Sequence, residues 1–406
     1  PRVAEPGYSR LELATQRQLT AFTTAESNFL ALPDHVLEVG WDAYLDARES
    51  ADEAARLLDQ GLPGGAFVEA LSAAMLMKAL EGTYSTVDDA LAQGGIVIQR
   101  AFDSAGNTER VFTDFLDKLS AYRVKTLADA EALITAYGNA FDAYTLYTYA
   151  QHNIDEVLTV ADTVGYASIE ELLNDAIAPL LYLEFSAGQV EAAEAIFEAG
   201  RELEAPALSA DADIDGIASF FRRGAEANLN AFSALVIDDL AESAGISSSV
   251  AESRLGDRDL AVAMAFSGSR LYYAIDAYLG EENPNSPYAE MGYGWLNYAR
   301  NASLVEKYSV NGQIDTSTFE ITGASSEALL VHSLDYSRGQ LARSIEVLGA
   351  HDYAPVLIVG AFESAGLKRE GDYAEKFDAL QDYTGSFAMT RALAYLGGFS
   401  TEGYRR

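Results

Sequence analysis

Apolar residues recur at every third or fourth position through most of this chain, which is the spacing of one face of an α-helix. In the stretch 191–203 the apolar face is formed by Ala192, Ala195, Ile196 and Ala199, and glutamates occupy the opposite side. The same pattern predicts further helices over 11–32, 52–58, 66–80, 110–119, 127–149, 169–185, 217–244, 258–279, 325–348, 355–367 and 373–396.

Two stretches depart from the helical pattern and predict β-hairpins. In 96–112, β-branched and aromatic residues flank the turn-forming residues 104–107. In 307–321, the pair Asn311-Gly312 suits a tight type I′ turn. The sequence therefore predicts an all-α fold, an irregular array of antiparallel helical hairpins that forms an α-solenoid or a bundle, with one or two small β-hairpins.

Loops are predicted where Pro, Gly, Asn and Ser gather, at 62–65, 204–216 and 280–288. The middle loop divides the chain into an N-terminal helical region, 1–205, and a C-terminal helical-hairpin region, 206–406. The second region could pack continuously with the first.

An internal repeat links two distant segments. Residues 183–190 closely match residues 334–341, and a proline follows each segment, at Pro206 and Pro355. Because glycine permits a tight turn between antiparallel helices, we expect Gly188 and Gly339 to mark corners where one helix ends and the next begins.

The second half of the unit 177–206 resembles a tetratricopeptide repeat. After Gly188, the small, aromatic and small positions of that motif are taken by Ala193, Phe197 and Gly200. Residues 328–355 follow the same spacing less closely, and the Trp, Gly and Tyr positions of the motif's first helix are unmatched. The resemblance implies stacked helical hairpins with a concave surface for a protein partner. The alternative is that two antiparallel amphipathic helices produce such spacings by themselves.

Composition narrows the possible functions. The 406 residues include 62 acidic and 27 basic ones, giving a net charge of -35, which disfavours binding to nucleic acid or to anionic lipid. A hydrophobic fraction of 49% indicates a folded chain. The absence of cysteine excludes disulfides, thiolate nucleophiles and Cys-ligated zinc, and it favours an extracytoplasmic location, periplasmic or secreted. No apolar run is long enough to predict a transmembrane helix.

The sharpest local motif is the loop 211–216, in which Asp211, Asp213 and Asp215 alternate before Gly216. Such an oxygen-rich loop resembles the first half of an EF-hand and predicts a Ca²⁺ site. The motif departs from an EF-hand at its twelfth position, which holds Arg222 in place of glutamate. The alternative is a solvated loop in which Asp213 or Asp215 caps the next helix.

A second acidic motif, Asp238, Asp239 and Glu242, has the spacing with which terpenoid synthases hold magnesium and diphosphate. Its alternative is a solvated helix end. The four histidines lack the Glu-x-x-His spacing of di-iron bundles, so transition-metal binding is disfavoured. These histidines are His35, His152, His332 and His351.

Three classes of function follow from these patterns. The first is a non-catalytic helical-repeat binding or scaffold protein in a larger assembly, with a protein partner or a second copy of itself. The second is an (α/α)-toroid hydrolase or lyase that acts on polysaccharide with paired carboxylates. The third is a terpenoid enzyme that uses the Asp238 motif. Tyrosines are frequent, 23 in all, and suit a wet binding face.

Overall fold

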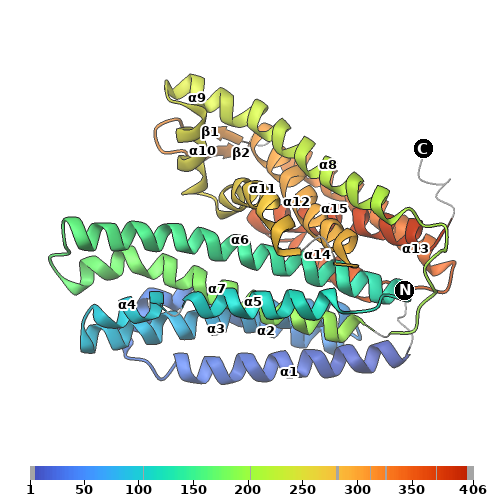
Figure 1. The fold of residues 1–406 in the computed structure, drawn as a ribbon, viewed down its shortest axis with the longest axis horizontal. Helices are drawn as coiled ribbons and strands as arrows, with labels where there is room; N and C mark the ends of the chain where they lie inside the picture. The colour runs from blue at the N-terminus through green and yellow to red at the C-terminus, as the bar shows by residue number, and fades with distance from the viewer. Residues whose placement is uncertain are drawn as a thin grey trace. The chain divides into compact units, whose positions relative to one another are not determined.

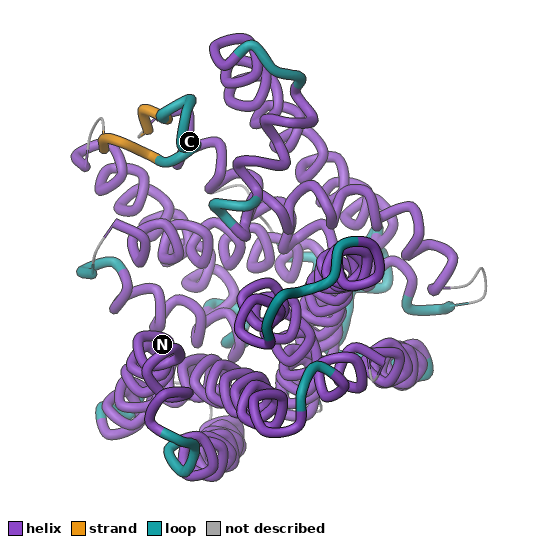
Figure 2. The backbone as a smooth tube through the Cα atoms, turned by 90° about the vertical axis from the view of Figure 1, so that its left-hand side faces the viewer, coloured by secondary structure: helices purple, strands orange, loops and turns teal. Residues whose placement is uncertain are grey.

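The structure is a computed structural model, and it shows the predicted all-α fold. It describes residues 5–103, 105–201, 203–279, 283–310, 312–324, 327–371 and 373–399. Figure 2 shows how helices make up nearly all of the drawn backbone, with one short pair of strands. Among the described residues, no helix is both long and apolar enough to cross a membrane.

Long helices form the first half of the chain. They are α1 (Glu5–Phe29), α2 (Asp34–Asp59), α3 (Pro63–Gln93), α4 (Ile96–Asp103), α5 (Ala105–Ser120), α6 (Leu127–Thr163) and α7 (Ile169–Gly200).

Shorter helices and the strand pair form the second half. They are α8 (Ile214–Phe232), α9 (Asp238–Ala244), α10 (Ser248–Gly256), α11 (Leu260–Leu279), α12 (Ser286–Val305), β1 (Gly312–Ile314), β2 (Ile321–Ala324), α13 (Glu327–Gly349), α14 (Val356–Lys368) and α15 (Tyr373–Leu396). Single π-helical turns follow α8, at Ser233–Ile237, and α12, at Glu306–Val310.

The chain divides into two compact units. The N-terminal unit comprises Ser9–Lys118 and Asn139–Ala195, and the C-terminal unit is formed mainly by Leu119–Gly138 and Ile196–Arg406. The division passes through α6 and α7, so both helices contribute residues to each unit.

Close helix packing holds the N-terminal unit together. A Cβ atom on Gly40 of α2 would lie 2.6 Å from the ring of Tyr84 on α3, so only glycine allows this approach. Nearby, the rings of Phe29 and Tyr44 stack with centroids 5.8 Å apart. A bundle of this kind buries the apolar stripes that the sequence pattern revealed.

The C-terminal unit is organised around α12, which packs against α8 and α15 (Figure 1). Gly292 of α12 allows a close approach to α6, because a Cβ atom there would meet the backbone of Ile134 at 2.4 Å. Gly294 allows the packing against α8, because a Cβ atom there would meet Phe221 at 2.7 Å. This close approach fixes α8 beside α12 and thereby positions the site described below.

The hairpin predicted over 96–112 is wrong, because these residues form α4 and α5. Ile98 and Phe102 are buried four residues apart, as are Phe112 and Leu116, so the apolar residues follow a helical stripe and not a strand. Of the predicted turn, Ser104 lies outside the described residues.

The second hairpin exists, but its turn lies elsewhere than predicted. β1 and β2 pair antiparallel with Gly312 opposite Ala324, and the loop between them starts at Asp315. There the Asp315 side chain accepts hydrogen bonds from the backbone of Ser317 and Thr318. Gly312 is therefore the first residue of a strand, and Asn311 lies outside the described residues.

The predicted helix corners at Gly188 and Gly339 are also wrong, because α7 and α13 each run unbroken through these glycines. At Gly188 the lack of a side chain serves packing, since a Cβ atom there would lie 3.1 Å from Met75 on α3. Corners instead lie at residues such as Gly94 and Gly245, whose positive φ angles of 89° and 66° favour glycine.

Candidate functional site

A cavity of about 750 Å³ lies in the C-terminal unit, between the first half of α8 and the last turns of α15. This volume is in the range of pockets that bind small molecules or side chains of a partner. We call it the aromatic cavity and define it by its functional side chains, which are Asp211, Asp213, Phe220, Arg223, Tyr298, Phe387, Arg391 and Tyr395.

The acidic rim of the aromatic cavity contains two of the three residues predicted to bind calcium. Asp211 and Asp213 line the cavity, whereas Asp215 does not. Asp213 is the residue that precedes α8, and its Oδ1 accepts a hydrogen bond from the backbone N–H of Gly216 at 3.0 Å. The capping alternative is thus confirmed for Asp213, and this cap explains why α8 begins at Ile214.

Within the described ranges, no group of three or more His, Asp or Glu side chains is arranged to hold a metal ion. The Ca²⁺ site of Asp211, Asp213 and Asp215 stays a prediction, which the titration described in the Discussion tests.

Aromatic rings form the walls of the aromatic cavity. Phe220 and Phe221 meet edge to face with centroids 6.1 Å apart, and they differ sharply in burial: Phe221 is 2% exposed and Phe220 is 63% exposed. Tyr395 on α15 is 45% exposed. Exposed aromatic rings gathered beside a cavity are typical of a surface that binds a partner.

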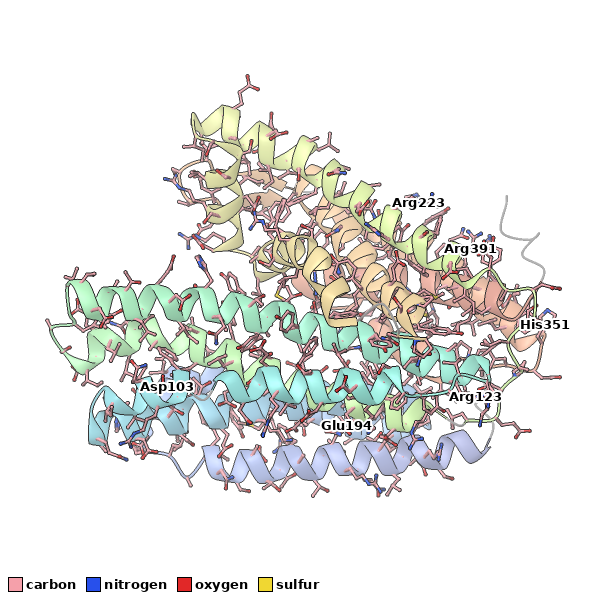
Figure 3. All side chains as sticks on the ribbon, in the orientation of Figure 1. Asp103, Arg123, Glu194, Arg223, His351 and Arg391 are labelled. Atoms are coloured by element: carbon pink, nitrogen blue, oxygen red, sulfur yellow. The ribbon has the colours of Figure 1, made fainter. Side chains whose placement is uncertain are left out.

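Two arginines give the aromatic cavity a positive side. Figure 3 shows Arg223 on α8 and Arg391 on α15. The Arg391 guanidinium carbon lies 5.8 Å from the ring centroid of Phe387 and 5.9 Å from that of Tyr395, which is the geometry of a cation–π contact. Its Nη2 also donates a hydrogen bond to the Tyr395 hydroxyl at 3.3 Å. These contacts hold the guanidinium against the two rings.

Sequence reasoning missed this aromatic and basic lining. On α15, Phe387, Arg391 and Tyr395 are spaced four residues apart, so they form one stripe along the helix. That spacing was the available signal, because an aromatic–Arg–aromatic stripe differs from both a purely apolar core stripe and a purely polar surface.

The other motifs singled out in the sequence lie apart from the aromatic cavity. Asp238, Asp239 and Glu242 are exposed at α9, and the Ser248 hydroxyl donates to Asp238 at 2.7 Å. This is the solvated helix end of the alternative interpretation. All four histidines are exposed; His152 lies 3.5 Å from Glu156, and His351 stacks on Phe399. The side chains of three tyrosines, Tyr272, Tyr273 and Tyr278, lie outside the described residues.

Two buried carboxylates of α6 serve as helix caps. Asp129 accepts hydrogen bonds from the backbone of Lys125 and Thr126, both at 3.0 Å, at the start of its own helix. Glu131 reaches α14, where Oε1 accepts from the backbone of Leu357 at 2.9 Å and Ile358 at 3.0 Å, and Oε2 accepts from the Tyr353 hydroxyl at 2.8 Å.

Burial raises the pKa of Glu131 to about 7, although the hydrogen bonds from Tyr353 and from the α14 backbone oppose this rise. Since its oxygens are engaged with α14, we assign this carboxylate a structural role.

Comparisons with protein families, with curated proteins and with solved structures give no match for this chain. The resemblance to tetratricopeptide repeats stays a prediction.

Proposed function

We propose that the protein is a non-catalytic helical binding or scaffold protein, and that the aromatic cavity holds a segment of a protein partner within a larger assembly. The observation that carries this proposal is the pairing of exposed aromatic rings with two arginines at one cavity. The acid excess and the lack of cysteine support an assembly outside the cytoplasm.

The lining defines the chemistry of the partner. Phe220 and Tyr395 offer apolar contact area, and Arg223 and Arg391 offer donors for a carboxylate. The fitting segment therefore has an aromatic or aliphatic side chain beside an acidic one. Arg391 is the stronger anchor of the pair, because its contacts with Phe387 and Tyr395 already restrict its side chain and reduce the entropy lost on binding.

An apolar anion tests the recognition chemistry directly. We expect anilinonaphthalene sulfonate to bind with a rise in fluorescence, and Arg391→Gln to weaken its binding about tenfold. Arg343→Gln is the matched control. Arg343 is exposed on α13, and its substitution removes the same charge outside the aromatic cavity. Equal binding to both variants would contradict the proposed recognition chemistry.

Photo-crosslinking tests the protein partner. Benzoylphenylalanine in place of Phe220 should capture a specific protein in extracts of the source organism, and Arg391→Gln in the same chain should reduce that capture. The control position is Trp41 on α2, an aromatic residue that is 41% exposed and belongs to the N-terminal unit. Capture that is equal at both positions, or unaffected by Arg391→Gln, would contradict a partner bound at the aromatic cavity. A crosslinked dimer of the chain would identify the partner as a second copy.

A further inference from the structure

A second cavity, of about 330 Å³, lies among the end of α12, α13 and α15 of the C-terminal unit and shares no lining residue with the aromatic cavity. Seven of its nine lining residues have polar side chains, and five of those seven carry a hydroxyl group. Its volume is at the lower end of the range for small-molecule sites and is sufficient for one sugar ring. We call it the hydroxyl cavity and define it by the six side chains that carry the argument, which are Glu306, His332, Ser333, Tyr336, Ser337 and Thr384.

Polar positions on two helices meet at the hydroxyl cavity. On α13, His332 and Ser333 are followed one helical turn later by Tyr336 and Ser337, so these four residues form one continuous patch along the helix. Thr384 on α15 extends this patch across the cavity. A helix face that packs against neighbouring helices is ordinarily apolar, so this composition indicates a wall that suits a polar ligand.

Glu306 is the first residue of the π-helical turn that follows α12. The Ser333 hydroxyl donates a hydrogen bond of 2.6 Å to its Oε1, which holds the carboxylate toward α13. The next two residues of the turn bind outside the cavity, since Lys307 Nζ and the Tyr308 hydroxyl both contact Oδ2 of Asp259 at 2.6 Å. π-Helical turns are rare and are frequently found at functional sites. This one combines a structural contact with a carboxylate that lines the cavity.

Several groups of the hydroxyl cavity are available to a ligand. Within the described part of the chain, the side chains of His332, Ser337 and Thr384 form no hydrogen bond or ion pair. Each of them can donate and accept, as can the hydroxyl groups of a sugar. Tyr336 is 64% exposed, and its ring offers a flat apolar surface on which the C–H groups of a sugar ring can stack.

The charge of the lining favours a neutral ligand. Among the described residues that line the hydroxyl cavity, Glu306 is the single acidic one, and neither lysine nor arginine occurs. A phosphate or carboxylate ligand would therefore meet Glu306 without a compensating cation. An ammonium ligand has donors alone, so it would leave the donor capacity of the hydroxyl groups unused. A neutral ring with several hydroxyl groups matches both the donors and the acceptors.

We propose that the hydroxyl cavity binds one hexopyranose sugar ring, which stacks on Tyr336 and exchanges hydrogen bonds with Glu306, Ser337 and Thr384. This inference does not depend on the function proposed for the aromatic cavity.

Ligand-observed NMR titration of the full chain tests the site, with glucose, galactose and mannose as the probes. We expect saturable binding of at least one of them, with a Kd on the order of 1 mM. Cyclohexanol keeps a ring with a single hydroxyl group, and cyclohexylammonium replaces that group by a positive charge. Both should bind at least about tenfold more weakly than the sugar. No saturable binding of any of the three sugars at about 50 mM, or equal binding of either cyclohexyl compound, would overturn the proposal.

Variants place the binding in the hydroxyl cavity. Tyr336→Ala removes the stacking surface at an exposed position, so the fold should persist while the sugar binds about tenfold more weakly. Tyr395→Ala is the matched control, because Tyr395 is 45% exposed on α15 and lines the aromatic cavity instead. Glu306→Gln keeps the shape of the side chain but loses the charge that strengthens hydrogen bonds from sugar hydroxyls, and it should also weaken binding about tenfold. Equal affinity in Tyr336→Ala and Tyr395→Ala, or unchanged affinity in Glu306→Gln, would refute the assignment.

Discussion

Two helices of the C-terminal unit begin with the same chemistry in opposite surroundings. At the start of α14, the backbone N–H of Leu357 donates to the carboxylate of Glu131, which is 2% exposed and lies 226 residues earlier in the chain. At the start of α8, the backbone N–H of Gly216 donates to the carboxylate of Asp213, an exposed residue directly before the helix. In both cases the carboxylate accepts backbone N–H groups that a helix leaves without partners. We infer that burial, and not the cap itself, decides how much the fold depends on each carboxylate.

The two helix starts differ in whether water can replace the acceptor when the carboxylate is removed. At α8, loss of the Asp213 side chain leaves an N–H group that water can reach. At α14, loss of Glu131 leaves the N–H groups of Leu357 and Ile358 and the hydroxyl of Tyr353 buried without an acceptor. Pro355, which precedes α14, offers no side-chain cap in compensation.

The largest effect is expected for Glu131→Ala. This variant should lower the free energy of unfolding by about 4 kcal/mol, because several buried donors lose the acceptor that Glu131 provides. Urea denaturation at about pH 5 measures it. Glu131→Gln is the control, since its amide oxygen can still accept from the α14 backbone, and it should cost less than about 1 kcal/mol. Equal losses in the two variants would show that a single acceptor oxygen is not enough and that the cap needs both oxygens of the carboxyl group.

The next effect is the pH dependence of the buried cap. The pKa of Glu131 is raised from 4.5 to about 7 in the folded protein, so the folded state holds the proton more tightly than the unfolded state. The stabilisation from this group is therefore complete below about pH 4.5 and is lost as the pH rises through 7.

Glu131→Gln isolates this contribution, because glutamine does not titrate. The stability of the natural chain relative to Glu131→Gln should fall by roughly 3 kcal/mol between about pH 5 and pH 8. A constant difference over this range would show that Glu131 is ionised throughout, and that the hydrogen bonds from α14 outweigh its burial.

The same contrast explains which parts of the molecule the sequence could predict. The helices were predictable because an apolar stripe is a local pattern, and the cap by Asp213 was predictable because cap and helix are adjacent. Glu131 could not be matched to α14 in this way, since the two meet only when α6 and α14 pack together. The hairpin at 96–112 failed for a related reason: residues such as Ile98 and Phe102 suit a strand by type, but their spacing of four places them on one helix face.

Only part of the candidate site was visible in the sequence. Asp211 and Asp213 stood out as a local motif, and both line the aromatic cavity. Phe220 and Arg391 did not, because they come from helices far apart in the chain and no local motif brings the two together. Gly188 shows the converse error: a glycine inside a helix marks close packing as readily as a corner.

A smaller effect is expected at the exposed cap. Asp213→Ala should lower the free energy of unfolding by about 1 kcal/mol, the usual value for loss of a capping side chain in contact with water. Asp213→Asn keeps an acceptor for the Gly216 N–H and should lower the free energy of unfolding by only about 0.3 kcal/mol. Thermal unfolding measures both. A loss at Asp213 as large as that in Glu131→Ala would break the comparison between the exposed and the buried cap.

The smallest effect concerns the Ca²⁺ site predicted at Asp211, Asp213 and Asp215. Asp213 caps α8 through Oδ1 alone, so the loop can be tested for a second role without disturbing the helix. Millimolar Ca²⁺ added to chelator-treated protein should raise the melting temperature by an amount equivalent to about 1 kcal/mol or less, because a ligand bound only by the native state stabilises that state. Asp213→Asn keeps the cap but removes a charge that calcium needs, so it should abolish this rise while leaving the stability without calcium nearly unchanged. An unshifted melting temperature in the natural chain, or the same shift in Asp213→Asn, would leave capping as the sole role of Asp213.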